Sequence, residues 1–119
     1  MRPPLALAAV VASLAAFAPQ AQAHTHLVSA DPAANAVVAS PKAITLRFNE
    51  TLAASFSSFE LTRSDGAKAA ITVALDTKDR KALRASLRAP LEPGVYKVSW
   101  RAVGKDAHRM TGAYSFTVR

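Results

Sequence analysis

The chain has 119 residues, with 15 lysines and arginines against 8 aspartates and glutamates, and its formal net charge is +7. It contains no cysteine, which excludes disulfides and means that a hydrophobic core must hold the fold together. The basic side chains are scattered and no aromatic residues are interleaved with them, which argues against nucleic acid as a partner.

Residues 1–23 show the three parts of a secretory signal. Arg2 supplies a positive charge, residues 5–17 are almost wholly apolar, and residues 21–23 read Ala-Gln-Ala, the small-residue pattern of a cleavage site. The apolar run is shorter than the roughly 20 residues that span a bilayer. We therefore predict a cleaved signal peptide over residues 1–23, export from the cytoplasm, and one mature domain over residues 24–119.

Hydrophobic and polar side chains alternate through most of the mature chain, which is typical of short β-strands. In residues 43–50, for example, Ile44, Leu46 and Phe48 share one face. The same alternation, with turns containing Gly and Pro between the segments, predicts about seven strands. They are expected at residues 26–30, 43–50, 58–64, 69–75, 81–89, 95–103 and 113–119.

The period of two, without a helical stripe, favours an all-β fold, a small antiparallel β-sandwich. Residues 31–42 contain two prolines and read as a polar connection between strands. Trp100, the single tryptophan, shares a face with other apolar residues of its strand and is expected in the core.

The three histidines of the chain fall in two short segments. His24 becomes the first mature residue, where its α-amine and its ring nitrogen can bind one metal ion at little ordering cost. An α-amine has a pKa near 8, so a metal can displace its proton at neutral pH. Nitrogen donors in a flat array favour Cu(II). Asp106 and His108, two residues apart on a predicted loop, are the candidates for the remaining ligands.

Glu50 shares the parity of Ile44, Leu46 and Phe48, so its carboxylate is expected to point inward and to need a partner. The partner is either a structural one, a backbone group or Arg101, or an imidazole that binds the metal and is oriented by Glu50.

His26 has two interpretations. In the first, it supports the site through a hydrogen bond. In the second, residues 24–26 bind Cu(II) or Ni(II) by themselves, through the amine, two deprotonated backbone amides and the ring of His26. The second mode needs no fold, and it leaves Asp106 and His108 without a role.

Three stretches of the sequence resemble the CopC family of exported copper-binding proteins: residues 24–33, residues 46–52 and residues 94–118. The resemblance implies a Greek-key β-sandwich of the Ig-like or cupredoxin-like kind, in the periplasm. It also implies one Cu(II) held by the amine and imidazole of His24 with Asp106 and His108, and Glu50 just outside these ligands. The implied function is to sequester or deliver copper in copper homeostasis or resistance, with a membrane copper importer or another periplasmic copper protein as recipient.

The sequence departs from the family pattern in two places. Arg109 follows the loop histidine where many members have Pro. Residues 62–76, which match a Met-rich Cu(I)-binding segment of some members, contain neither Met nor His. We therefore expect one Cu(II) site and no Cu(I) site.

Two other functions compete with copper binding as such. A copper-dependent oxidative enzyme can use an N-terminal histidine brace, but this chain is short, lacks an aromatic platform for a glycan, and would fill with Asp106 a position that oxygen needs. A structural or adhesive sandwich would leave the histidines incidental. We expect a monomeric binding protein without enzymatic activity.

Overall fold

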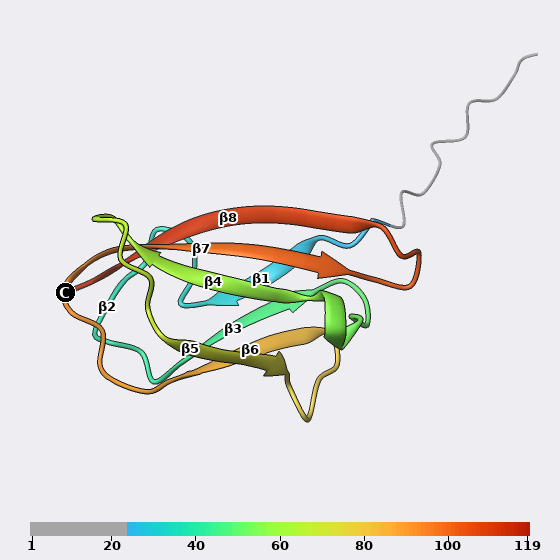
Figure 1. The fold of residues 1–119 in the computed structure, drawn as a ribbon, viewed down its shortest axis with the longest axis horizontal. Coiled ribbons are helices and arrows are strands. Elements are labelled where there is room, and N and C mark those ends of the chain that lie inside the picture. Colours follow the sequence, from blue (N-terminus) through green and yellow to red (C-terminus); the bar gives the residue numbers. More distant parts are fainter. Residues whose placement is uncertain (1–23) are drawn as a thin grey trace, which may run out of the picture.

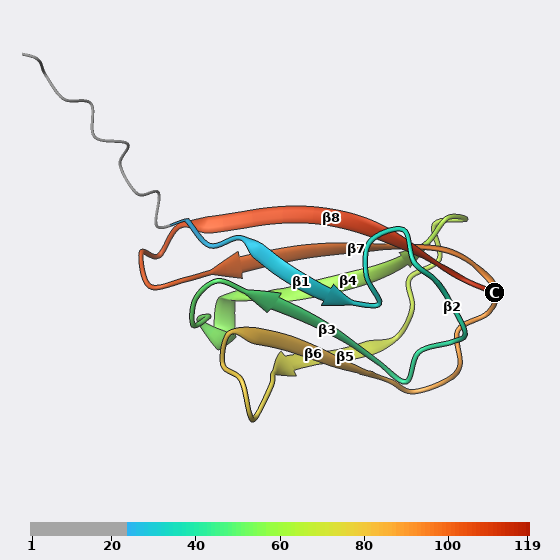
Figure 2. The same ribbon diagram turned by 180° about the vertical axis from the view of Figure 1, so that it is seen from behind.

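The computed structural model describes residues 24–119, which form two β-sheets packed face to face (Figures 1 and 2). The predicted signal segment lies outside the described residues. One sheet contains β1 (Leu27–Asp31), β3 (Ala43–Phe48), β6 (Ala82–Leu87) and β5 (Ile71–Leu75), in that order. The other contains β2 (Val37–Val38), β8 (Arg109–Val118), β7 (Gly94–Val103) and β4 (Ser58–Arg63). The single short 3-10 helix of the described residues, η1, spans Ala54–Phe56, and no helix there is long and apolar enough to cross a membrane.

The β-sandwich is confirmed, and each of the seven predicted segments overlaps a strand. The eighth strand, β2, lies inside the predicted connection over residues 31–42. It pairs in parallel with the end of β8, whereas the other strand pairs are antiparallel. Two residues are too few to show a period, which is why alternation does not reveal this strand.

The strand β8 begins at Arg109, earlier than the alternation indicates. Gly112 lies opposite Trp100 in the β7–β8 pair, and a methyl group at Gly112 would overlap the Trp100 ring. The tryptophan therefore covers the glycine, and the strand continues through a position with no hydrophobic side chain. Trp100 is only partly buried and packs edge-on against Phe48, with ring centroids 5.1 Å apart.

The core lies between the two sheets and is built from their inward-facing side chains. Each large apolar side chain removed from water contributes about 1.5–3 kcal/mol, which explains how a chain without disulfides stays folded. The largest fully buried apolar residues are Ile44, Leu46, Phe48, Leu61, Leu83, Val98 and Phe116.

One end of the sandwich gathers segments that are far apart in the sequence (Figures 1 and 2). The strands β7 and β8 pair along their whole length, up to Val103 and Arg109, so residues 104–108 form the loop at this end. Leu27 of β1 pairs with Phe48, the last residue of β3, which brings residues 24–26 to the same end. The backbone thus sets the chain start beside the β7–β8 loop.

Tyr114 joins β8 to the segment after β1, because its hydroxyl donates to the carbonyl of Pro32 at 3.0 Å. Burial, with a smaller contribution from the charge of Asp31, raises the pKa of Tyr114 to about 12. A raised folded-state pKa means that the contribution to stability is present below pH 10 and is lost as the pH rises toward 12.

We expect Tyr114→Phe to lower the free energy of unfolding by about 1 kcal/mol at pH 7, because it removes one hydrogen bond. It should also flatten the decline of stability between pH 10 and 12. Denaturant unfolding across that pH range tests this. Tyr96→Phe, which removes a hydrogen bond to the Glu92 carbonyl, is the matched control. An equally steep alkaline decline in Tyr114→Phe and wild type contradicts the assignment.

Candidate metal centre

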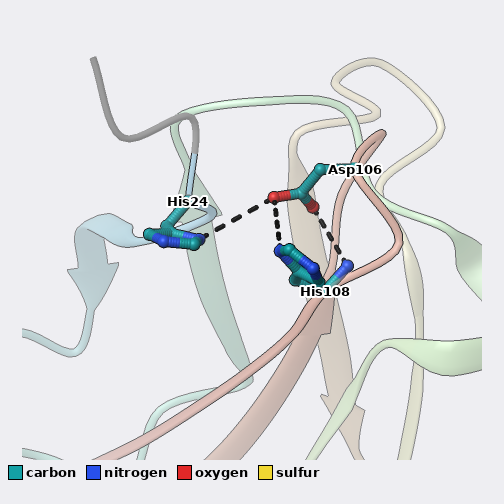
Figure 3. A group of neighbouring side chains, drawn as sticks. All are labelled: His24, Asp106 and His108. Atoms are coloured by element: carbon teal, nitrogen blue, oxygen red, sulfur yellow. Dashed lines mark hydrogen bonds and ion pairs between the residues drawn. The ribbon is translucent and has the colours of Figure 1, made fainter. Parts of the chain in front are cut away.

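The three side chains predicted as metal ligands lie together at this end of the sandwich (Figure 3). His24 precedes β1, whereas Asp106 and His108 belong to the loop between β7 and β8. One ligand atom from each lies within 4.8 Å of the others. The Oδ2 atom of Asp106 is 3.8 Å from His24 Nδ1 and 3.4 Å from His108 Nδ1. One carboxylate oxygen therefore faces both imidazole rings.

A tight turn directs Asp106 and His108 to the same side. The amide of Ala107 donates to the Gly104 carbonyl at 3.2 Å, and Ala107 has a left-handed φ of 61°. The Oδ1 atom of Asp106 accepts from the amide of His108 at 3.1 Å, so Oδ2 is free to face the rings. The two side chains, two residues apart on the predicted loop, therefore share a side because the backbone turns between them.

The Nδ1 atom of His24 is buried and has no hydrogen-bond partner among the residues that the structure describes. Leaving a buried polar atom unpaired costs about 1–3 kcal/mol, so native proteins rarely keep one without a reason. A metal ion would supply the missing partner. Donor atoms about 2 Å from an ion lie at most about 4 Å apart, so the three ligand atoms need only a small approach to hold one.

The centre is open on the side of His108. The side chain of His108 is 68% exposed, against 26% for Asp106. An ion can therefore reach the centre and leave it without a large movement of the sandwich.

Asn49, which directly follows β3, attaches the segment around His24 to the sandwich. Its Nδ2 atom donates to the His24 carbonyl at 3.2 Å, and its Oδ1 atom accepts from the His26 amide at 2.8 Å. Its own amide donates to the His26 carbonyl at 3.2 Å. In the sequence, Asn49 falls between the inward positions of Phe48 and Glu50, so hydrophobic alternation does not reveal this role. Its place just after a strand, where Asn side chains often bond nearby backbone, is the one signal of this role in the sequence.

The two residues predicted to support the ligands, His26 and Glu50, both contact the segment around His24. The Nδ1 atom of His26 is 3.3 Å from the His24 carbonyl oxygen. The Oε1 atom of Glu50 accepts from the hydroxyl of Thr25, a fully buried residue, at 2.6 Å. The partner of Glu50 is therefore Thr25, rather than Arg101 or an imidazole. The effect of His26 and Glu50 on metal binding stays a prediction.

The CopC domain model matches residues 27–119. The chain belongs to the CopC family. Among curated members, it is 38% identical to Protein YobA of Escherichia coli (strain K12) over 117 residues, which cover 96% of this chain and 92% of that protein. It is 39% identical to Copper resistance protein C of Pseudomonas syringae pv. tomato over 108 residues, 83% of each chain. The predicted family resemblance is thus confirmed.

Solved CopC-family structures have the same fold. PcoC, described as a methionine-rich copper resistance protein from Escherichia coli, matches with a TM-score of 0.75 and 40% identity over 82% of this chain and 100% of that chain. CopC from Methylosinus trichosporium OB3b matches with a TM-score of 0.73 and 32% identity over 80% and 93%. Unlike a methionine-rich protein, this CopC-family chain has two methionines, Met1 and Met110.

Gly104 leaves room for the contact between Thr25 and Glu50, because a methyl group at Gly104 would overlap both the hydroxyl and the carboxylate. We expect Gly104→Ala to lower the free energy of unfolding of the metal-free protein by about 1–3 kcal/mol. The same change in a Glu50→Ala background should cost less, since part of the overlap is gone. Denaturant unfolding of the wild type, the two single variants and the double variant measures the cost of Gly104→Ala in each background. Equal costs in the two backgrounds would refute the steric explanation.

Asn49→Ala removes both side-chain hydrogen bonds to the backbone of His24 and His26. We expect the affinity for Cu(II) to fall about 10–100-fold, as when residues that orient metal ligands are lost. Competition titration against a chromophoric chelator measures the change. Ser29→Ala, an exposed position on β1, is the control and should bind as wild type does. Unchanged affinity in Asn49→Ala would show that the side-chain hydrogen bonds of Asn49 do not position His24.

Proposed function

We propose that the mature domain binds one Cu(II) ion through the α-amine and Nδ1 of His24 together with Asp106 and His108, and that it sequesters or delivers copper in the periplasm. The observation that carries this proposal is the buried, unpartnered Nδ1 of His24 facing the Asp106 carboxylate. Copper resistance proteins among the relatives support the choice of metal.

The donor set suits Cu(II). Nδ1 is the ring nitrogen that can close a chelate ring with the α-amine of the same residue, once the bond between residues 23 and 24 is cut. Two imidazoles, an amine and a carboxylate oxygen make the kind of nitrogen and oxygen array that Cu(II) favours. The carboxylate also offsets part of the charge of the ion in a partly buried place. In this proposal the protein retains copper through the binding affinity of these ligands, without any chemical reaction.

The hydrogen bonds of residues 24–26 favour the shared site over local binding. A local chelate needs the backbone nitrogens of Thr25 and His26, yet the His26 amide donates to Asn49 Oδ1 at 2.8 Å. Thr25 is fully buried, so its backbone is not free to move toward an ion. Local binding would have to break this packing, whereas the shared site uses it.

Copper binding, rather than oxidation of a substrate, is the proposed role. The Asp106 carboxylate would fill a coordination position that dioxygen needs. Met110 is the only methionine after residue 23, so we propose no Met-rich Cu(I) site. The protein would act as a monomer and pass copper to a membrane copper importer or to another periplasmic copper protein.

Mass spectrometry of the exported protein, followed by Cu(II) titration, tests the proposal. We expect a first residue of His24 and one Cu(II) per chain. Asp106→Ala, His108→Ala and one extra residue before His24 should each lower the affinity by orders of magnitude, because each removes a ligand. His26→Ala is the comparison variant and should lower the affinity far less, because it removes only the contact of the ring with the His24 carbonyl and not a ligand.

The opposite pattern, with tight binding in Asp106→Ala and loss in His26→Ala, would establish the local chelate instead. Equal affinity in an exported form that begins elsewhere would refute the role of the α-amine. Oxidation of a polysaccharide by the copper-loaded protein with a reductant would support the enzymatic alternative.

A further inference from the structure

An exposed aromatic side chain stands beside the metal centre. Phe56, at the end of η1, is 65% exposed. It lines a cavity of about 430 Å³ together with Ser55, Arg101, Val103, Ala107 and Arg109. We call this surface the Phe56 face. The other large exposed hydrophobic residues of the described chain, Val28, Val37 and Val95, are not part of it.

The strand register places the two arginines of the Phe56 face on the same outward side. Val103 pairs with Arg109, and Ala102 beside it is fully buried, so Arg101 and Val103 point outward. Both arginines are exposed, and no ion pair among the described residues involves either. On the neighbouring strand β4, Arg101 pairs with Ser58, and the first carboxylate along that strand is Glu60. Its carboxylate is paired with Lys68 at 3.5 Å. The face therefore carries two positive charges that form no ion pair with the described residues.

The Phe56 face is fixed to the loop that carries the metal ligands. Ala107 lies between Asp106 and His108, and Arg109 directly follows them. The segment around η1 is held to the end of β7, because the Ala53 amide donates to the Val103 carbonyl at 2.8 Å. The Val103 amide in turn donates to the Ser57 hydroxyl at 3.0 Å. A molecule docked on this face would thus contact Ala107 and Arg109, the residues directly before and after His108.

We propose that the Phe56 face docks an acidic segment of a copper-accepting protein, with an apolar side chain of that segment in the cavity and carboxylates on Arg101 and Arg109. The proposal rests on the proposed copper-binding function. Arginine and aromatic residues are enriched at protein interfaces, and an arginine fork binds a carboxylate with two parallel hydrogen bonds. The acceptor would take Cu(II) by ligand exchange at His108, so no oxidant or reductant is needed.

A protein segment fits the Phe56 face better than a membrane does. Stable membrane contact takes several inserted apolar side chains or a larger basic cluster, whereas this face offers one aromatic ring beside a cavity. Two arginines at fixed register positions instead match discrete carboxylates. The two positive charges also predict that an acidic partner associates faster than a neutral one. The difference between the two association rates should shrink markedly as the salt concentration rises.

Two synthetic peptides with the same N-terminal Cu(II)-binding tripeptide, Asp-Ala-His, provide the probe. One continues with alternating Glu and Leu, and the other with Gln and Leu. We expect the acidic peptide to take Cu(II) from the wild-type protein about tenfold faster at low salt. The preference should disappear in Arg101→Ala/Arg109→Ala and shrink in Phe56→Ala. Arg84→Ala/Arg88→Ala, which removes two charges from the other sheet, is the matched control and should keep the preference.

Equal rates for the two peptides, or equal losses in both arginine double variants, would overturn the proposal. A membrane-binding surface would also overturn it. In that case the wild-type protein, but not Phe56→Ala, would bind phosphatidylglycerol vesicles, and neither peptide would be preferred. Fluorescence anisotropy of the labelled acidic peptide with metal-free protein measures docking without copper. A failure of Cu(II) binding at His24 would therefore refute the proposed function and still leave docking to be decided.

Discussion

The attachment of residues 24–26 to the end of β3 is the constraint on which the metal centre depends. Asn49 bonds the backbone on both sides of Thr25, and Glu50 bonds the Thr25 hydroxyl. Two consecutive residues directly after β3 thus hold a short segment by its backbone and by one side chain. These bonds restrict the position of the His24 backbone, and therefore of its ring, relative to Asp106.

The same attachment carries an energetic cost. It buries the Nδ1 atom of His24 beside a carboxylate, where no other described residue forms a hydrogen bond with it. In the metal-free protein the unpaired atom makes an unfavourable contribution to the free energy of folding. A bound ion would make that contribution favourable. A preorganised site of this kind loses little entropy when it binds, because the fold has already ordered the ligands. If the proposed site binds an ion there, the stability lost at this atom in the metal-free protein would be regained as binding affinity.

Much of the fold could be predicted from the sequence, because alternation through residues such as Ile44, Leu46 and Phe48 reports directly on a half-buried strand. β2 and the first part of β8 could not, since one is too short for a period and the other contains a glycine under Trp100. The clustering of His24, Asp106 and His108 was foreseen from chemistry. The roles of Asn49, Thr25 and Gly104 were not, because they depend on which backbone groups lie opposite them in space.

The placement of the ligands has a mechanical consequence. His24 leads into β1 of one sheet, whereas Asp106 and His108 join two strands of the other. A bound ion would therefore tie the two layers together at their open end, as a disulfide does in many exported domains. In a chain without cysteine, the bound ion would itself be the cross-link between the two sheets, and its release would remove that cross-link.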